Sequence, residues 1–400
     1  MKRLGLFLEA EASAGGIFQY SQAMVDAFAA LSVQYELAVA CTSRSWAPYL
    51  EQHPFRVTWL KHAKAGLKLA ALFKAALLPG AVARPVTALI NPIAWQLKAL
   101  NCDLWLFPGP DAIAYQLPVA SLISIHDLMH RYERRFPEVG GGYRYYVRDH
   151  RFGEMARWSK GILVDSKTGR DQVVKAYGVD PAKIHPLPYI PPRYIFAPSP
   201  AGDADRKYGL PPKYIFYPAQ LWAHKNHESL IDAVAAIKSR HPEIHLVLTG
   251  KGRHRYKDLL GQSNARGVTQ NITFLGYVPD EDLPALYRGA RALVMPTFLG
   301  PTNIPPLEAF ACDCPVAVSG IYGMPEQLGD AALYFDPNSV SEIADAVERL
   351  WIDDGLCETL RARGRQKLAN WNQDAFNHEL EKILAAMLPG GFQSNIQRRA

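Results

Sequence analysis

The sequence predicts a two-domain α/β protein in which each domain is built on a parallel β-sheet. Its 400 residues exceed what a single hydrophobic core usually serves. Along both halves, short apolar runs alternate with helical patterns, as in sheets whose strands are joined by covering helices. The halves are separated by "PLPYIPPRYIFAPSPAGDADRKYGLPP", a proline-rich stretch of weak periodicity that is typical of a linker.

The composition is that of an ordinary globular protein, with 48% hydrophobic and 20% charged residues. Glu9 and Glu11 interrupt the first apolar run too early for a signal peptide, and no stretch approaches the ~18 apolar residues of a spanning helix. We therefore expect a cytoplasmic protein. The formal net charge of +6 suits an anionic ligand or an anionic membrane surface, although many soluble enzymes share it.

In the first half, strands are predicted at residues 3–9, 35–41, 55–61, 103–107, 119–126 and 161–165. Helices are predicted at residues 16–31 and 143–158, and Ser166 stands at an N-cap position.

In the second half, strands are predicted at residues 214–219, 245–249, 272–277, 292–296, 315–319 and 332–335. Helices are predicted at residues 228–239, 282–288, 306–312 and 340–351. Asp280 is expected to cap the second of these helices.

These elements give a first domain at 1–190, a linker at 191–212 and a second domain at 213–375. Residues 376–400 are expected to form a C-terminal helix and tail able to cross back to the first domain. The five cysteines lack the spacing of a zinc site or a disulfide framework. Cys312 and Cys314 could form a redox or metal pair, but we interpret them as small buried thiols.

Ligands of open α/β sheets bind beyond the carboxyl ends of the strands, so the residues that follow each strand are the candidates. Gly15 and Gly16 follow the first strand and form either a plain turn or an anion site at a helix N-terminus. His126 ends the fifth strand, where it can donate a hydrogen bond or move a proton. The other interpretation of His126 is a locally satisfied structural histidine.

In the second half, Lys225 stands just before a helix, where its charge and the helix dipole would act together on a phosphate. Gly250 follows the next strand. The turn of residues 302–304 precedes a helix that begins at a proline, and its backbone N–H groups would face an anion. Glu308 lies in the first turn of that helix and could accept hydrogen bonds from two hydroxyl groups, or simply favour the helix dipole.

These loops resemble one family along essentially the whole chain. The motifs, in order, are the Gly-Gly turn, "HDLMH", "AQLWAHKNH", "LTGKG", "FLGYVPDEDLPALY" and "PPLEAFACDCPVAVSGIYGMPEQLGDAALYFDP". They are similar to the retaining glycosyltransferases of the GT-B fold in family 4, or group 1, and most specifically to bacterial mannosyltransferase-like enzymes of polysaccharide assembly. The resemblance implies two Rossmann-like domains whose parallel sheets face each other across a cleft.

The resemblance also implies roles for individual residues. Lys225 matches the lysine that grips the donor diphosphate, and Glu308 the second glutamate of an E-x7-E motif, which holds the ribose. His126 matches a histidine that approaches the donor sugar. We thus expect His126, Lys225 and Glu308 to be catalytic. The expected donor-binding residues are Gly15, Gly16, Gln220, Lys225, Gly250, Tyr277, Val278, Thr302, Asn303, Ile304 and Glu308.

Two positions depart from the family pattern. The first acid of the E-x7-E motif would fall at Gly300, and the arginine that precedes the lysine falls at Gln220. Sugar recognition at 300–303 is therefore expected to rely on the backbone and on the Thr302 or Asn303 side chain.

The function implied is transfer of a hexose, mannose or a related sugar, from a nucleotide-diphosphate sugar to a glycan or lipid-linked acceptor. We expect no metal and no cofactor, favour GDP-mannose as donor, and expect no nucleic-acid partner. The basic, apolar segment 61–78 is expected either to contact anionic lipid at the inner face of the cytoplasmic membrane or to pack on the first domain.

Two rival functions remain. The same fold could carry other chemistry, such as a phosphorylase or an epimerase of nucleotide sugars. The missing acid at Gly300 also leaves room for a non-catalytic nucleotide-sugar-binding protein. An oxidoreductase is disfavoured because the G-x-G-x-x-G fingerprint is absent.

Overall fold

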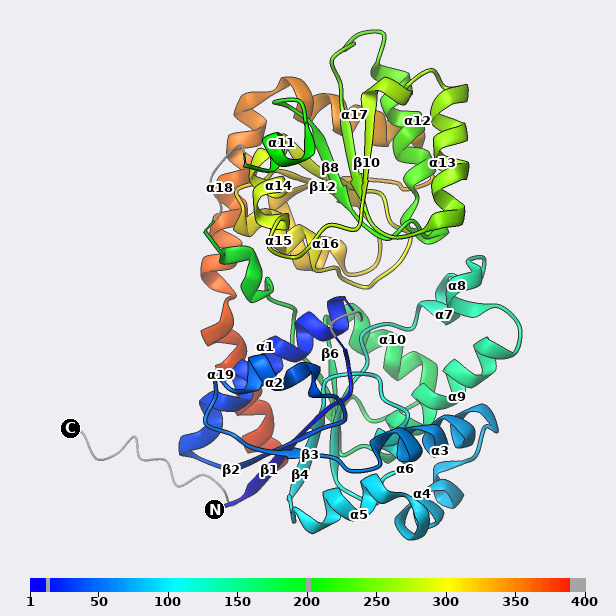
Figure 1. Ribbon diagram of the computed structural model, residues 1–400, viewed down its shortest axis with the longest axis vertical. Helices are drawn as coiled ribbons and strands as arrows, with labels where there is room; N and C mark the ends of the chain where they lie inside the picture. Colours follow the sequence, from blue (N-terminus) through cyan, green and yellow to red (C-terminus); the bar gives the residue numbers. More distant parts are fainter. Residues whose placement is uncertain (12–14, 199–202, 389–400) are drawn as a thin grey trace, which may run out of the picture. The chain divides into compact units, whose positions relative to one another are not determined.

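The computed structural model describes residues 1–11, 15–198 and 203–388, which form two compact units (Figure 1). The first unit comprises Met1–Arg134, Val139–Pro188 and Gln373–Ala400, and the second comprises Arg135–Glu138 and Tyr189–Asn372. Each unit has its own parallel sheet and its own hydrophobic core, as the sequence predicts.

The first sheet has seven strands among the described residues, in the order β3-β2-β1-β4-β5-β6-β7. The strands are β1 Arg3–Leu8, β2 Glu36–Cys41, β3 Arg56–Trp59, β4 Leu104–Phe107, β5 Ser121–Ser124, β6 Gly161–Val164 and β7 Ile184–Pro186. β4, β5 and β6 are buried throughout, as expected for strands covered on both faces. The strand order reverses between β1 and β4, which makes that point the switch point of this sheet.

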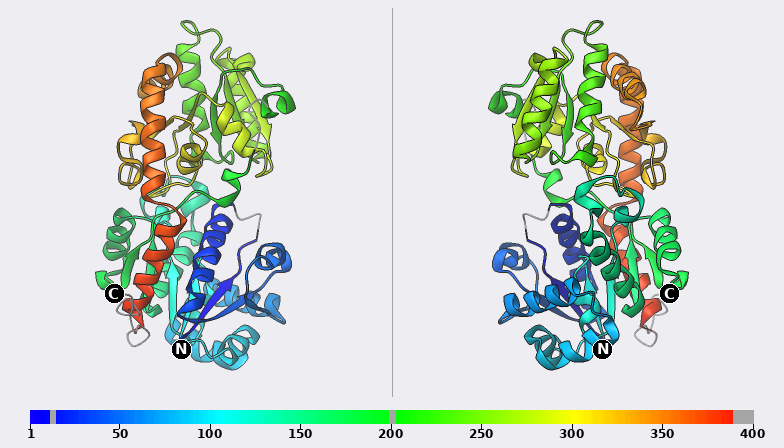
Figure 2. Two further views of the ribbon diagram at one scale, coloured as in Figure 1. Left: turned by 90° about the vertical axis from the view of Figure 1, so that its left-hand side faces the viewer. Right: turned by 90° about the vertical axis from the view of Figure 1, so that its right-hand side faces the viewer.

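Helices cover this sheet and, except for α19, lie between its strands along the chain (Figure 2). They are α1 Gly16–Ala30, α2 Ala47–Leu50, α3 Ala63–Ala75, α4 Gly80–Ile90, α5 Pro92–Ala99, α6 Ile113–Gln116, α7 Met129–Tyr132, α8 Pro137–Gly140, α9 Tyr143–Trp158, α10 Lys167–Tyr177 and α19 Gln373–Met387. Ser166 caps α10 as predicted, because its hydroxyl accepts the N–H of Gly169 at 2.9 Å. The last helix, α19, packs along α1, and the Gln34 amide donates to the Glu381 carboxylate at 2.8 Å.

The second sheet has six strands among the described residues, in the order β10-β9-β8-β11-β12-β13. Its strands are β8 Ile215–Pro218, β9 Leu246–Thr249, β10 Ile272–Gly276, β11 Ala292–Met295, β12 Val316–Ser319 and β13 Ala332–Phe335. Its helices are α11 Asp203–Tyr208, α12 His227–Ile237, α13 Arg253–Ala265, α14 Leu283–Gly289, α15 Pro305–Ala311, α16 Met324–Leu328, α17 Val340–Ile352 and α18 Asp354–Asn370. The switch point lies between β8 and β11.

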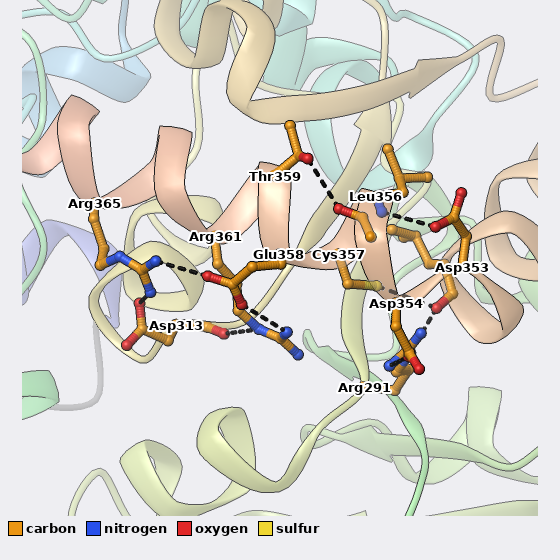
Figure 3. A network of polar contacts seen from close by, with 12 residues as sticks. Arg291, Asp313, Asp353, Asp354, Leu356, Cys357, Glu358, Thr359, Arg361 and Arg365 are labelled. Atoms are coloured by element: carbon orange, nitrogen blue, oxygen red, sulfur yellow. Dashed lines mark hydrogen bonds and ion pairs between the residues drawn. The ribbon is translucent and has the colours of Figure 1, made fainter.

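Ion pairs and a helix cap hold α18 in the second unit (Figure 3). The Asp353 carboxylate caps the first turn of the helix, and Arg291, just before β11, pairs with Asp354 at 2.6 Å. Farther along α18, Arg365 pairs with Asp313, in the turn between α15 and β12, at 2.9 Å. These contacts connect α18 to the loops that precede β11 and β12.

Several elements differ from the sequence prediction. The short strand β7 was not predicted. The side chain of Asp280 does not cap α14, which begins at Leu283 after Asp282, and the Asp282 carboxylate instead accepts from Lys207 and Tyr208. The predicted linker contains the 3-10 turn Arg193–Phe196 and α11, and Ile195 is fully buried in the second core.

Among the described residues, no helix is both long and apolar enough to cross a membrane. Cys312 and Cys314 are free and buried in the second core, and burial raises the pKa of the Cys312 thiol to about 12. They are the small buried thiols that the sequence predicts.

Candidate functional site

Lys225 ends a 3-10 turn, Ala223–Lys225, that leads from β8 into α12. Its carbonyl oxygen accepts the hydroxyl of Tyr217 at 3.0 Å. The next residue, Asn226, has a left-handed backbone with φ of +60°, and its side-chain amide donates to the Pro337 carbonyl at 2.8 Å. Asparagine tolerates this conformation better than most residues do. The backbone of Lys225 is therefore fixed on both sides.

His224, the residue before Lys225, donates two hydrogen bonds to Glu138, an acid 86 positions earlier in the chain. The Glu138 Oε1 atom accepts both the backbone N–H of His224, at 2.9 Å, and its ring Nδ1–H, at 2.7 Å. His224 is 3% exposed. Burial opposes the charge of Glu138, yet the hydrogen bonds from His224 hold the pKa of this carboxyl below its usual range. Glu138 was not among the predicted site residues.

The same segment also contacts the loop after β11. Phe136 stacks on Phe298 with ring centroids 5.3 Å apart, and the Arg135 guanidinium lies 4.2 Å from the centre of the Phe298 ring. The N–H of Phe298 in turn donates to the carbonyl of His224 at 2.8 Å. Residues 135–138 of the second unit therefore support two of its strand-end loops at once.

His227, the first residue of α12, lies buried beside Lys225. Burial, with the neighbouring Lys225 charge, lowers the pKa of His227 to about 3, so the ring is neutral at physiological pH. Its ring packs on Tyr217, and its Nε2 atom has no hydrogen-bond partner among the described residues. Lys225 is thus the cation of this turn.

The loops after β8, β9 and β10 meet around Gly250. Gly250 has φ of +126°, and a Cβ atom built there would lie 2.1 Å from the carbonyl oxygen of Ala219. Its N–H donates to the carbonyl of Gly276 at 2.6 Å. Only glycine fits this approach. The predicted residue Gln220, next to Ala219, is exposed.

Tyr277 and Val278, two of the expected donor-binding residues, follow β10. The Val278 side chain is buried in the core, whereas Tyr277 is 64% exposed. The Lys251 ammonium lies 4.4 Å from the centre of the Tyr277 ring. Tyr277 therefore presents an aromatic face flanked by a cation at the carboxyl edge of the second sheet.

The turn after β11 differs from the prediction in one respect. Asn303 does not offer a free N–H, because the Gln327 side chain accepts this N–H at 3.1 Å and donates to the Asn303 carbonyl at 2.9 Å. Ile304 precedes α15, which has seven residues and begins with Pro305 and Pro306, so the first two helix positions carry no N–H. An anion at this helix end would find few backbone donors.

Gly300, where the family acid is missing, has φ of +100°. A Cβ atom at this position would lie 2.7 Å from the Asn303 Nδ2 atom and 2.8 Å from the Thr302 carbonyl oxygen. The Asn303 amide also donates to the carbonyl of Leu299 at 3.2 Å. The turn is thus built for glycine, and no side chain enters it without strain.

Glu308 is 4% exposed, and both of its carboxylate oxygens accept tyrosine hydroxyls. Tyr194 donates to Oε1 at 2.5 Å and Tyr287 donates to Oε2 at 2.6 Å. Burial raises the pKa of Glu308, and the two hydroxyls partly oppose this rise. The acid thus accepts two hydroxyl groups, as predicted, but both belong to the protein. Since a carboxylate has about four acceptor sites, further donors are not excluded.

The predicted residues of the first unit lie at the carboxyl edge of its own sheet. Gly15, with φ of +58°, precedes α1, which begins at Gly16. The His126 Nε2 atom lies 2.8 Å from the carbonyl oxygen of Pro108, so this nitrogen carries a proton. Burial lowers the pKa of His126, which keeps the ring neutral at physiological pH. His126 is thus oriented by the loop after β4.

His130 is structural. It is fully buried and lies 3.1 Å from Asp149, which also accepts from Arg131 and from Tyr177. Burial lowers the pKa of His130 to about 4. Among the described residues, no group of three or more His, Cys, Asp or Glu side chains is arranged to hold a metal ion, and metal independence stays a prediction.

The second sheet thus gathers Lys225, Gly250, Tyr277, Thr302 and Glu308 at the ends of its strands, while His126 and the Gly15–Gly16 turn lie in the first unit. Sequence reasoning missed four supporting side chains, namely Glu138, Tyr194, Tyr287 and Gln327. Tyr194 and Glu308 are 114 positions apart, and no local pattern links them.

Comparison with known proteins agrees with this arrangement. Residues 203–367 match the family model described as glycosyl transferases group 1. Over 153 residues the chain is 39% identical to the O-antigen chain mannosyltransferase B of Escherichia coli, covering 37% of this chain and 39% of that relative. Over 232 residues it is 28% identical to a D-inositol 3-phosphate glycosyltransferase of Salinispora arenicola, covering 53% of this chain and 52% of that relative. The chain spans about half or less of these relatives.

Solved structures extend the likeness to the whole chain. The Anabaena HepE protein, crystallised with UDP and glucose, superposes with a TM-score of 0.73 at 15% identity, covering 96% of this chain and 100% of that one. The sucrose-phosphate synthase of Thermosynechococcus elongatus gives 0.71 at 17% identity, covering 97% and 99%. At such identities the likeness shows the fold alone. Residues 203–367 are therefore similar to the group 1 glycosyl transferases, and the two α/β units carry the GT-B fold.

Proposed function

We propose that the protein is a retaining glycosyltransferase that moves a hexose from a nucleotide-diphosphate sugar to a glycan or lipid-linked acceptor in the synthesis of a cell-surface polysaccharide. The observation that carries this proposal is the Lys225 turn, fixed at the head of α12 inside the segment that matches the family. A lysine ammonium beside a helix N-terminus binds a diphosphate through charge and dipole together.

In the proposed reaction, the bond between the anomeric carbon and the diphosphate oxygen breaks, and the acceptor hydroxyl bonds to the same face of that carbon. The hydroxyl proton passes to the departing phosphate oxygen. Lys225 stabilises the negative charge that develops on the diphosphate, assisted by the turn at Gly15 and Gly16. His126, neutral and oriented by the Pro108 carbonyl, would hydrogen-bond the donor sugar.

GDP-mannose is the donor we favour, because several relatives, including the Escherichia coli protein above, are named as mannosyltransferases. The base would stack on the exposed ring of Tyr277, and Glu308 would bind the ribose. Recognition of the sugar at 300–303 would use the backbone and the Thr302 or Asn303 side chain. We further propose that no metal or cofactor takes part.

The identity of the donor is tested by a thermal-shift panel of UDP, GDP and dTDP compounds, followed by transfer assays with the nucleotide sugar that stabilises the protein most.

The role of Lys225 is tested by substitution. Lys225→Ala should abolish transfer and weaken nucleotide binding, whereas Lys257→Ala, which changes an exposed lysine of α13, should leave both unchanged. Near-normal turnover of the Lys225→Ala variant would refute the assignment.

A non-catalytic nucleotide-sugar-binding protein is a second candidate, favoured by the glycine at 300 and by the two tyrosines that already occupy Glu308. Such a protein would bind the donor but transfer nothing to any lipid or glycan. An epimerase of the same fold would convert the donor without an acceptor. Assays with and without acceptor separate the three.

Segment 61–78 is proposed to contact anionic lipid at the inner face of the cytoplasmic membrane. Residues 61–98 contain no Asp or Glu, and exposed apolar side chains gather on α3, α4 and α5, including Leu72 at 62% and Leu89 at 74% exposure. Lys64 and Lys68 are exposed, whereas Lys74 is half-buried.

Flotation with vesicles rich in anionic lipid tests this contact. A Lys64→Glu/Lys68→Glu variant should float less than the wild type, while a variant with Lys160→Glu, an exposed lysine outside this surface, should behave like the wild type. Equal flotation of all three proteins would exclude this membrane contact.

A further inference from the structure

Two contacts within the first unit hold the ring of His126. The Pro108 carbonyl accepts its Nε2–H at 2.8 Å, and the Tyr20 ring packs edge-on to it, with centroids 4.8 Å apart and planes 82° apart. A neutral imidazole that donates from Nε2 has its acceptor at Nδ1, so turning the ring over would exchange donor and acceptor. The contacts therefore fix both the plane of the ring and the nitrogen that accepts a hydrogen bond.

Tyr20 connects His126 to the glycine turn. It lies on α1, one helical turn after Gly16 and on the same face of the helix, and is 5% exposed. Burial raises the pKa of Tyr20 above its usual range, so the hydroxyl keeps its proton and does not serve as a base. Tyr20 thus joins the two features of the first unit that the proposed mechanism places on the donor, without taking part in proton transfer itself.

The C-terminal helix α19 holds α1 in place on the side of Tyr20 (Figure 1). At the start of α19, the side-chain amide of Gln373 donates to the Ala23 carbonyl at 3.3 Å. One turn later, the fully buried Phe376 packs edge-on to the Tyr20 ring, with centroids 6.2 Å apart. A continuous series of ring contacts therefore runs from α19 through Tyr20 to His126.

We propose that Phe376 and Tyr20 are positioning residues for the transfer reaction, through which α19 sets the orientation of His126. This role rests on the proposed function, because it affects catalysis only if His126 contacts the donor sugar. The orientation of the ring does not depend on that function. Because a misplacement of about 1 Å can cost about 100-fold in rate, small shifts at either residue should lower turnover. If both were only core residues, their loss would change stability and leave His126 as it is.

Nitrogen-15 NMR of the histidine rings tests the positioning without a substrate. His126 is assigned by the signals that disappear in His126→Gln. In the wild type, Nε2 should show the shift of a protonated nitrogen and Nδ1 that of an unprotonated one, because a single tautomer is fixed. Tyr20→Leu should move the two shifts toward each other, whereas Tyr20→Phe, which keeps the ring, should match the wild type. Averaged shifts in the wild type would overturn the inference, whatever the variants show.

Turnover gives the second test, measured as release of GDP from GDP-mannose. Tyr20→Leu should lower kcat at least about tenfold and Phe376→Leu about threefold or more, with the KM changed less than about twofold, because the second unit mainly holds the diphosphate. Phe28→Leu is the matched control, since Phe28 is a fully buried aromatic residue of the same helix that packs on Phe55 instead. It should keep the kcat and the His126 shifts of the wild type.

Equal losses of kcat in the Phe28→Leu and Tyr20→Leu variants would overturn the inference. So would a Tyr20→Leu protein whose His126 shifts and turnover match the wild type. If Tyr20→Leu fails to fold, then Phe376→Leu gives the same comparison from the other end of the contact. If the His126 shifts respond as expected but the wild type consumes no nucleotide sugar, then the proposed function fails and the orientation of His126 by α19 stands.

Discussion

At the scale of single residues, Glu308 shows how the chain fixes one buried acid between two tyrosine hydroxyls. Burial raises its pKa, but a hydroxyl donated to each oxygen opposes that effect. Tyr287 is itself fully buried, and its ring packs edge-on to Phe216 with centroids 5.1 Å apart. The carboxylate therefore has a fixed orientation before any ligand arrives.

Tyr287→Phe should remove one of these hydrogen bonds without changing the packing. A hydrogen bond to a charged, buried group contributes about 1.5–3 kcal/mol, so urea unfolding at pH 7 should show a loss of that order. Because the pKa of Glu308 is raised in the folded protein, ionisation of Glu308 lowers the stability as pH rises through this pKa. In acid, where Glu308 is protonated, the Tyr287 hydroxyl no longer binds a charged group, so the loss of stability caused by Tyr287→Phe should be smaller. Tyr256→Phe, at an exposed tyrosine, should show neither effect.

Glu138 is a positioning residue for the Lys225 turn. Glu138→Ala removes the shared acceptor of the His224 backbone and ring N–H groups and should weaken binding of the preferred nucleoside diphosphate about tenfold, measured by calorimetry. Glu138→Gln keeps an acceptor oxygen and should retain most of the affinity. If both variants bind like the wild type, then Glu138 does not position Lys225.

The lowered pKa of Glu138 predicts how nucleotide binding depends on pH. A carboxyl with a lowered folded pKa contributes stability above its unfolded pKa and loses that contribution as pH falls through the folded value. Nucleotide binding should therefore hold at neutral pH and decline in acid. In the Gln variant this component of the decline should be absent.

At the scale of elements, Gly250 determines how closely three strand-end loops approach. Gly250→Ala would place a Cβ atom against the Ala219 carbonyl at a φ that L residues rarely adopt. We expect a loss of about 1–3 kcal/mol in the free energy of unfolding, measured by urea denaturation. The matched change Gly261→Ala, within α13 where the added atom meets nothing within 4 Å, should stabilise by up to about 1 kcal/mol.

Elements also show where sequence reasoning succeeded. Fully buried apolar strands such as β11 and capped helices such as α10 were predicted because their signals are local. The strand β7 was missed because it is short and lies at the edge of its sheet, next to prolines. The prediction that Asp280 caps α14 was wrong because Asp282 is the residue directly before the helix. The Asp282 carboxylate accepts hydrogen bonds from Lys207 and Tyr208 instead of capping the helix.

The candidate site was predictable to a similar extent. Lys225 and Gly250 follow strands, so their placement follows from the fold. The contacts of Glu138 with His224 and of Tyr194 with Glu308 join residues 86 and 114 positions apart, which no periodicity reports. The N–H of Asn303 was predicted to face an anion. No sequence pattern indicates that the Gln327 side chain, 24 positions later, accepts this N–H instead.

At the scale of the whole molecule, the described residues of the two units pack in separate cores that need not unfold together. Scanning calorimetry should resolve two transitions. A nucleoside diphosphate at about 100 times its Kd should stabilise the second unit by about 2.7 kcal/mol and raise one transition only. A single transition that shifts with the ligand would contradict this independence.

The return of the chain at Gln373 has a consequence for synthesis. The helix α19 belongs to the first unit, where it lies along α1 and where the Phe376 ring packs edge-on to the Tyr20 ring with centroids 6.2 Å apart. On the ribosome, residues 1–188 therefore emerge without the helix that covers α1, whereas nearly all of the second unit emerges in one piece. The first unit is thus completed only after the second, and its α1 surface stays uncovered until α19 has emerged.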